Sequence, residues 1–380
     1  MDKIFLDNNS TTPLDPKIID KMIPFFTEKF GNPSSRTHSF GWEAEAYVEK
    51  SRDYISNLIN SDSSEIIFTS GATESNNLAI INSIENYKNS HMITMSSEHK
   101  AILDICKHLN KKGLEVTYIN PEENGIVDIS NIEKNINEKT KIVSIMHVNN
   151  EIGVIQPIKE IGQICRKNNI IFHVDAAQSL GKIGIDVKDM NIDLLSLSSH
   201  KAYGPKGIGC LYIRNKIKNV KPLFFGGNQE KGLRPGTLPV PLIIGLGEAC
   251  KIIDESINDD TKKIAELRNL LLKRIISKIP DTIINGDLEN RIPGNINLSF
   301  PSLKGQSIIT TLPNIAISSG SACTSSSPSP SHVLRSIGLS SPLINSTIRI
   351  GIGRFNTISE INIAAETIID AINKKTNNKW

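Results

Sequence analysis

The chain has 380 residues, of which 38% are hydrophobic and 22% are charged, values that are ordinary for a soluble globular protein. Lys and Arg number 43 against 40 Asp and Glu, so the formal net charge of +3 gives no reason to expect direct nucleic-acid binding. The N-terminus has no charged leader before an apolar stretch, and no apolar run reaches the length of a membrane span. We therefore expect a cytoplasmic protein without membrane contact.

Short apolar runs alternate with helical patterns through the first two thirds of the chain. Strands are predicted at residues 65–69, 91–95, 141–148, 170–175, 193–198 and 207–213, with helices between several of them, such as 158–167. This alternation predicts an α/β fold with a mostly parallel sheet, and ligands of such sheets bind at the edge where the strands end.

The pattern changes near residue 240. Helices are predicted from about 242 to 257 and from about 260 to 279, and strands near 295–300 and 347–352. A last helix begins near Thr357, which forms a capping box with Glu360. We predict a large α/β domain over residues 16–250, and a smaller α+β domain made of residues 1–15 and 251–380.

The five cysteines have wide, irregular spacing without a C-x-x-C pair, which argues against a structural zinc site and a disulfide scaffold. Cys323 stands in a segment, residues 318–331, that is nearly all Ser, Gly, Pro and Thr, so a mobile loop with a reactive thiol is predicted there. The other four have apolar neighbours and are predicted to be small core residues: Cys106, Cys165, Cys210 and Cys250.

A buried-type strand leads into Ser198, His200 and Lys201, followed by a Gly-Pro turn. A lysine there suits a Schiff base with pyridoxal phosphate (PLP), because desolvation or a nearby cation lowers the pKa of its amine. Alone, such a lysine is more often a solvated loop residue. Asp175 ends the strand predicted at 170–175 and could pair with the ring nitrogen of PLP, or could simply cap the next helix.

Residues 65–74 are predicted to form a strand, a glycine turn and the start of a helix, where free backbone N–H groups bind anions. Ala72 and Thr73 could hold a phosphate there, although a plain turn with a Thr cap explains them as well. His99 and Asn150 follow two further strands. His99 could stack on the cofactor ring, while a lone His is more often an ordinary core or surface residue. No nucleotide-binding glycine motif occurs in the required context.

Together these segments resemble the cysteine desulfurases of the NifS/IscS type, PLP-dependent transferases with the aspartate aminotransferase-like fold (fold type I) among the class V aminotransferase-like enzymes. The resemblance covers nearly the whole chain, and Phe40-Gly-Trp-Glu-Ala-Glu45 with Ser318-Ser-Gly-Ser-Ala-Cys-Thr-Ser325 points to the IscS branch. The other matching segments are residues 6–13, 31–38, 68–75, 146–153, 198–207 and 236–239.

The resemblance implies a role for each candidate residue. Lys201 would bind PLP, Asp175 would pair with the ring nitrogen and Gln178 with the ring hydroxyl, and His99 would stack on the ring and transfer protons. The substrate carboxylate would bind Asn150 and Arg349, with Arg354 either a structural partner or an interface salt bridge. The phosphate would be held by Ala72, Thr73, Ser198, His200 and the partner subunit's Thr237, which implies an obligate homodimer, and Ser199 would also belong to the cofactor site.

The resemblance also implies the reaction and its partners. L-cysteine would become L-alanine while the Cys323 thiolate takes the sulfur as a persulfide. The acceptors would be an IscU-like iron–sulfur scaffold protein and small sulfur carriers, which serve iron–sulfur cluster assembly and tRNA thiolation. No intrinsic metal is expected, and Cys323 would be at most a transient [2Fe-2S] ligand together with the scaffold.

Some positions depart from the family pattern. Asn228, Lys231 and Pro235 are substitutions in the glycine-rich segment 226–237, which affects the geometry of the dimer-side phosphate contact, and Ser10 replaces the usual Ala. The sequence ends at Trp380, where IscS-like chains continue into a tail that contributes to scaffold docking. Docking is therefore expected to be weaker, to use other surfaces, or to serve another acceptor.

Two kinds of alternative function remain open. The first is another PLP enzyme on the same fold. A selenocysteine lyase would share the fold and cofactor, whereas an aminotransferase needs no mobile cysteine and is disfavoured by Cys323. A non-catalytic platform for iron–sulfur assembly is disfavoured because Lys201, Asp175, His99 and Cys323 are all present.

Overall fold

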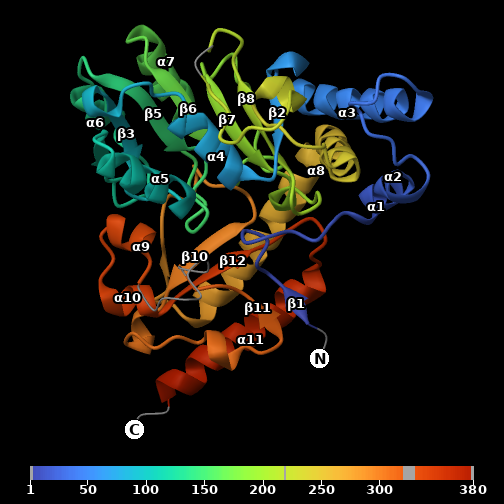
Figure 1. Cartoon of the computed structure of the whole chain (residues 1–380). Helices are drawn as coiled ribbons and strands as arrows, with labels where there is room; N and C mark the ends of the chain where they lie inside the picture. Colours follow the sequence, from blue (N-terminus) through green and yellow to red (C-terminus); the bar gives the residue numbers. More distant parts are fainter. Residues whose placement is uncertain (1–2, 218–219, 320–329, 378–380) are drawn as a thin grey trace.

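The computed structural model describes residues 3–217, 220–319 and 330–377 (Figure 1). Its largest element is a seven-stranded sheet with the order β2-β8-β7-β6-β5-β3-β4. The strands from β3 to β7 run parallel, and β8 is antiparallel to both of its neighbours. The strands are β2 (Ile66–Thr69), β3 (His91–Met95), β4 (Glu115–Ile119), β5 (Thr140–Met146), β6 (Ile171–Asp175), β7 (Leu194–Ser198) and β8 (Gly209–Ile213).

The mostly parallel α/β sheet is thus confirmed, and six of its strands lie within about two residues of the predicted positions. The sequence pattern did not reveal β4, which lies at the edge of the sheet beside β3. Apart from Ile119, its side chains are exposed or only partly buried, and Glu115 and Thr117 interrupt its apolar residues. An edge strand with one neighbour buries less surface than a central strand, so its hydrophobic signal is weaker.

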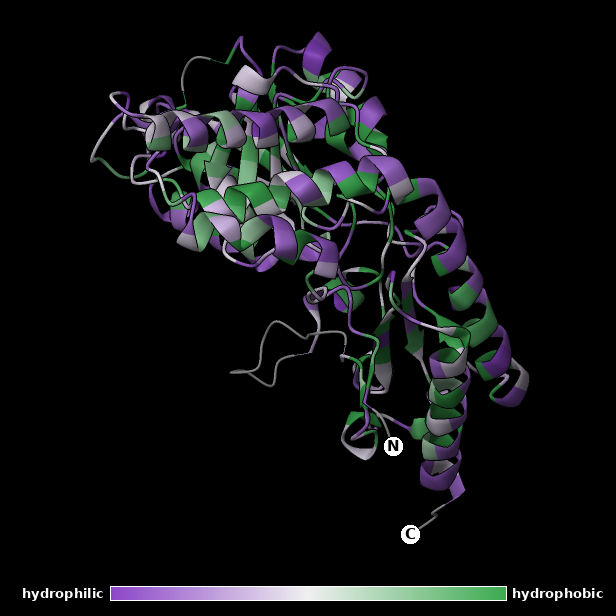
Figure 2. Ribbon diagram, turned by 90° about the vertical axis from the view of Figure 1, so that its right-hand side faces the viewer, coloured by the Kyte–Doolittle hydropathy of each residue, from purple (hydrophilic) through white to green (hydrophobic). Residues whose placement is uncertain are grey.

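Helices cover both faces of this sheet, because alternate strand side chains point to opposite faces. One apolar core joins the sheet to α3 (Ser39–Leu58), α6 (Ile129–Asn135), α7 (Ile158–Lys167) and the first half of α8 (Val240–Lys278). The opposite core joins it to α4 (Ala72–Ile81) and α5 (Lys100–Lys111). In Figure 2 the strands are mainly hydrophobic, whereas the helices carry both hydrophobic and hydrophilic residues.

The C-terminal third forms a second core around a three-stranded antiparallel sheet. Strand β10 (Asn295–Ser299) lies between β9 (Ile283–Ile284) and β12 (Thr347–Gly351). The second half of α8 and α11 (Ile358–Asn377) pack on it, together with the parallel pair β1 (Ile4–Phe5) and β11 (Ile315–Ala316). The capping box of Thr357 and Glu360 at the start of α11 is confirmed.

The prediction of two helices between residues 242 and 279 is wrong, since α8 is continuous over 39 residues. No Gly or Pro stands near residues 257–260. Asp260 accepts hydrogen bonds from Ser256 and Arg354 there, so it does not cap a new helix. Since α8 crosses residue 250, the division into domains at that position stays a prediction.

Four short α-helices complete the α-helical elements of the described residues. They are α1 (Pro16–Met22), α2 (Pro24–Thr27), α9 (His332–Ser336) and α10 (Ser341–Asn345). Within the ranges given above, no helix has both the length and the apolar character that crossing a bilayer requires. The four described cysteines are buried free thiols, as predicted.

Candidate active site

A cavity of about 480 Å³ lies where the carboxyl ends of the central strands meet residues of the N-terminal segment and of β12. The loops after β2, β3, β5, β6 and β7 each contribute a side chain to its wall, as expected for the ligand-binding edge of an α/β sheet. The predicted residues that line it are Ala72, Thr73, His99, Asn150, Asp175, Gln178, Ser198, His200, Lys201 and Arg349.

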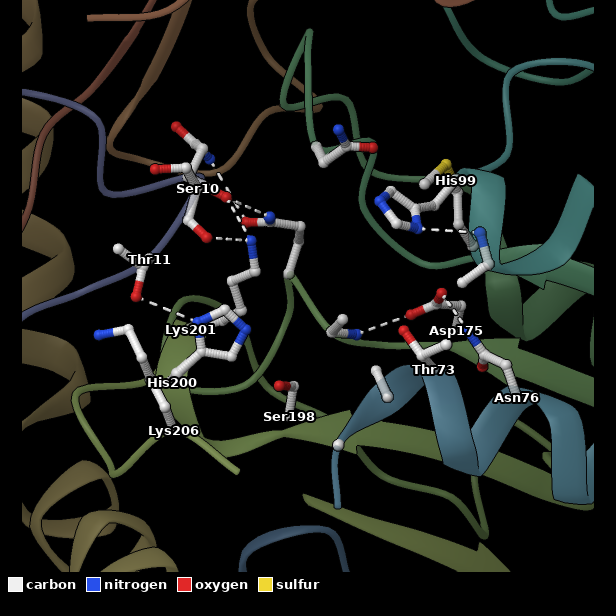
Figure 3. A pocket seen from close by; sticks show the side chains of 18 of the residues that line it. Ser10, Thr11, Thr73, Asn76, His99, Asp175, Ser198, His200, Lys201 and Lys206 are labelled. Carbon is white, nitrogen blue, oxygen red and sulfur yellow. Dashed lines mark hydrogen bonds between the residues drawn. The ribbon is translucent and has the colours of Figure 1, made fainter. Parts of the chain in front are cut away.

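Lys201 ends a short 3₁₀ turn, Ser199–Lys201, that follows β7 directly. Its Nζ donates hydrogen bonds to the carbonyl oxygens of Asn9, at 2.8 Å, and Ser10, at 2.5 Å. The N-terminal segment is fixed at this place because the Thr12 N–H donates to the carbonyl of His200. The amine therefore lies inside the cavity, held by backbone acceptors from the other end of the chain (Figure 3).

Asp175 is the last residue of β6 and is 5% exposed. Its Oδ2 accepts a hydrogen bond from Asn76 at 2.8 Å, and its Oδ1 accepts one from the N–H of Ala177 at 3.0 Å. The side chain thus both caps the following turn and lines the cavity. His99 precedes α5 and accepts from the N–H of Ala101 through Nδ1, and its ring lies across the cavity from Lys201 in Figure 3.

One end of the cavity is suited to an anion. Gly71 has a φ of +149°, a value that favours glycine, and it turns the chain from β2 into α4. The first N–H groups of α4 have no partner within the helix and can bind an anion there. Ser198, His200 and Lys206 line the same cavity. Burial and the charges of Lys201 and Lys206 lower the pKa of His200 to about 4, so its imidazole is neutral at pH 7.

Arg349 reaches the cavity from β12 and is 1% exposed. Its Nη2 forms an ion pair with Asp7 at 2.8 Å, and its Nη1 donates to the carbonyl of Asn150 at 3.0 Å. The buried Nε of Arg349 and the Oδ1 of Asn150 have no protein partner. A donor and an acceptor without partners at one site leave hydrogen-bonding capacity for a polar ligand.

Several candidates lie elsewhere. Ser199 is fully buried and lies against Gly204, outside the cavity, because successive side chains of a 3₁₀ turn point about 120° apart. Thr237 is exposed and does not line the cavity of its own chain. Arg354 forms ion pairs with Asp15 and Asp260, both at 2.8 Å, which supports its interpretation as a structural salt bridge. Cys323 lies outside the described residues.

The cavity also contains side chains that the sequence did not single out. Asn76 lies one turn into α4, on the side that faces Asp175. Lys206 belongs to the Gly-Pro turn after Lys201, and its position five residues after Lys201 could have marked it as a candidate for the same site. Asn9, Ser10 and Thr11 come from a motif that the resemblance had matched without giving it a role.

An amine, a carboxylate, an imidazole and a guanidinium thus surround one cavity that also offers an anion site. Such a set can bind a ligand with a phosphate at one end and a basic ring at Asp175, and can receive a second, carboxylate-bearing molecule at Arg349. Among residues 3–217, 220–319 and 330–377, no group of three or more acidic, His or Cys side chains gathers in a way that could hold a metal ion.

Comparison with known proteins agrees with the family resemblance that the sequence motifs indicated. The model of the aminotransferase class-V family matches residues 4–363. The cysteine desulfurase IscS of Rickettsia prowazekii is 53% identical over 374 residues, which are 98% of this chain and 91% of that protein. A solved structure described as a NifS-like protein superimposes with a TM-score of 0.91, at 35% identity, and covers 98% of this chain and 100% of that one. Another, described as SspA in complex with cysteine, gives a TM-score of 0.83 at 38% identity, and covers 93% and 100% of the two chains.

Proposed function

Because the chain belongs to the aminotransferase class-V family, and within it to the cysteine desulfurases of the NifS/IscS type, we propose that it is itself a PLP-dependent cysteine desulfurase. It takes sulfur from L-cysteine, leaves L-alanine, and holds the sulfur on Cys323 as a persulfide. The observation that carries this proposal is the convergence of Lys201, Asp175, His99 and Arg349 on one cavity.

The residues of the cavity fit PLP by charge and by position. Lys201 would hold the aldehyde carbon, Asp175 the ring nitrogen and Gln178 the ring hydroxyl. Thr73, Ser198, His200 and the first N–H groups of α4 would hold the phosphate. When bound, PLP withdraws electrons from the amino acid attached to it, and a carboxylate at the ring nitrogen strengthens this effect.

Arg349 would receive the substrate carboxylate through its unpartnered Nε–H, and Asn150 through the N–H groups of its side-chain amide, since both residues line the cavity. The Cys323 thiolate would attack the sulfur of the bound cysteine, so that one C–S bond breaks and one S–S bond forms. The former Cβ then takes a proton, for which His99, which lines the cavity, is the candidate donor. The net reaction, L-cysteine and thiol to L-alanine and persulfide, needs no external oxidant or reductant.

We further propose a homodimer in which the partner subunit's Thr237 completes the phosphate site. Thr237 is exposed and away from the cavity of its own chain, and the loop before α8 also exposes Phe225 by 88%. An aromatic side chain that is so exposed is typical of an interface. Sedimentation at micromolar concentration tests this directly: a dimer is expected, and a monomer that retains full PLP content would contradict it.

We propose that the sulfur passes to an IscU-like scaffold protein and to sulfur carriers, for iron–sulfur cluster assembly and tRNA thiolation, with Cys323 as a transient cluster ligand. The four buried thiols agree with a reducing compartment, and we propose the cytoplasm. Sulfur release to a purified scaffold protein, measured with and without reductant, tests the first of these proposals.

The experiment that tests the function is incubation of purified protein with L-cysteine, followed by measurement of alanine and sulfide. The parent is expected to form both in equal amounts when a thiol reductant is present. Cys323→Ser should keep the visible PLP absorption band and form no sulfide. Cys106→Ala, which changes a buried core cysteine, is the matched control and should keep both the PLP absorption band and sulfide formation. Full turnover in Cys323→Ser, or turnover on selenocysteine alone, would overturn the proposal.

A further inference from the structure

Lys182 contacts the wall of the cavity from behind. Its Nζ donates a hydrogen bond of 2.7 Å to the Oε1 of Gln178, four residues earlier. Gln178 lines the cavity and is 4% exposed, whereas Lys182 does not line it. Lys182 instead lines a small separate cavity together with Tyr203, Thr261 and Ile264. Any effect of Lys182 on a ligand in the main cavity therefore passes through Gln178 or through its charge.

Lys182 and Asn9 together determine the orientation of the Gln178 amide. An ammonium group only donates hydrogen bonds, so it selects the carbonyl end of the amide and turns the NH₂ end away from itself. The Nε2 of Gln178 donates to the carbonyl oxygen of Asn9 at 2.7 Å, and that same oxygen accepts from Lys201 at 2.8 Å. An amide NH₂ carries two hydrogens, so one remains for a ligand atom in the cavity.

Electrostatics links the same residues. Burial and the positive charges of Lys201 and Arg349 lower the pKa of Lys182. Such an interaction is mutual, because each cation disfavours protonation of the others. With its pKa lowered to about 7, Lys182 adds positive charge on the side of the cavity where Lys201 binds the cofactor up to about that pH, and it does not line the cavity itself.

We propose that Lys182 is a positioning residue: by holding the carbonyl end of Gln178, it presents the Gln178 NH₂ to the ring oxygen of the cofactor and favours the unprotonated nitrogen of cofactor-bound Lys201. This inference rests on the proposed function, since it requires PLP on Lys201 with its ring hydroxyl beside Gln178. Without Lys182, the carbonyl end of the amide keeps only the longer contact with Asn9, at 3.4 Å, and the local positive charge falls. Both changes favour the protonated form of that nitrogen.

The test is a pH titration of the visible absorption band of the holoenzyme, without substrate. Lys182→Met should raise the midpoint of the titration by about one pH unit, and Lys182→Arg, which keeps the charge and the donors, should restore it to that of the parent. Lys182→Gln keeps a neutral donor and should give a smaller shift in the same direction. It also replaces Lys182→Met should that variant not fold.

Equal midpoints in the parent, Lys182→Met and Lys182→Gln would overturn the inference. An equal shift in Lys182→Met and Lys182→Arg would also overturn it, because this result would indicate a general packing effect. Failure of the proposed function gives a different result, namely a parent protein that shows no visible band with PLP at any pH.

Discussion

The Nδ2 atom of Asn76 lies 2.8 Å from the Oδ2 atom of Asp175, and both side chains are buried. This hydrogen bond joins the first turns of α4 to the end of β6, and it orients the carboxylate at the cavity. A carboxylate that must remain charged beside a basic ring benefits from such a donor, since hydrogen bonds to the charged form favour it.

Asn76→Asp should therefore impair the enzyme strongly. A second carboxylate replaces the donor, and two like charges at hydrogen-bonding distance raise the pKa of the pair, so that Asp175 is no longer reliably charged. We expect turnover of L-cysteine to fall by about 10- to 100-fold, the equivalent of a hydrogen bond to a charged group. Asn77→Asp adds the same charge one residue away and is the control. Equal losses in the two variants would contradict the role of this contact.

Arg349→Lys should raise the KM for L-cysteine more than it lowers kcat. Lysine keeps the positive charge but loses the Nε donor that the folded protein leaves without a partner, together with the Nη groups that hold Asp7 and the carbonyl of Asn150. We expect a rise in KM of about tenfold or more, measured together with inhibition by L-alanine. Arg354→Lys, at a salt bridge outside the cavity, should leave KM near that of the parent. An unchanged KM in Arg349→Lys would exclude Arg349 as the carboxylate ligand.

Glu151 predicts a pH dependence of stability. Burial raises its pKa from 4.5 to about 7, although Ser331 donates a hydrogen bond to it at 2.5 Å and Arg349 and His99 partly offset the burial. Because the folded-state pKa is the higher one, the stabilising contribution of Glu151 is complete below about pH 4.5. It is lost as the pH rises to about 7, when the buried carboxyl must ionise.

Glu151→Gln should remove this dependence, because the amide stays neutral at every pH. The free energy of unfolding of the variant minus that of the parent should increase by roughly 3 kcal/mol between pH 5 and pH 8, at about 1.4 kcal/mol per pKa unit. Urea unfolding at the two pH values measures this difference. A difference that does not change with pH would mean that Glu151 titrates normally in the folded protein.

The Arg52–Glu230 pair predicts a loss of stability away from the cavity. The side chain of Glu230 is 2% exposed, accepts from Arg52 at 2.9 Å, and also accepts from the N–H of Phe68. Arg52→Met leaves a buried carboxylate without its counter-ion, which costs about 3–5 kcal/mol. Lys107→Met breaks the exposed pair with Asp104 and should cost under about 1 kcal/mol. Similar urea midpoints for both variants would contradict this.

The sequence predicted the part of the site that the sheet itself creates. Asp175 ends a strand with a clear apolar run, and Lys201 and Asn150 come within four residues after two others; parallel strands bring their carboxyl ends to one edge. The position of Lys201 in a cavity could be inferred in this way. Its acceptors, the carbonyls of Asn9 and Ser10, could not, because about 190 residues separate them and only the folded chain brings them together.

Other features had no signal in the local pattern. The partner of Asn76, Asp175, lies on another element, and a polar residue near the start of a helix is more often solvated. Lys182 itself lies behind the cavity wall, although its partner Gln178 is only four residues earlier. The continuity of α8 was missed because Asp260 resembles a helix cap, while in the fold it binds Arg354. Propensity at such a position yields to a tertiary contact.

The most direct test of the account is mass analysis of the peptide that contains Cys323, after the protein has been exposed to L-cysteine without reductant. We predict that this peptide gains one sulfur atom, which a thiol reductant removes, and that the alanine formed equals the sulfur gained. Alanine formed without sulfur on Cys323, or with the sulfur on Cys106, Cys165, Cys210 or Cys250, would contradict the account.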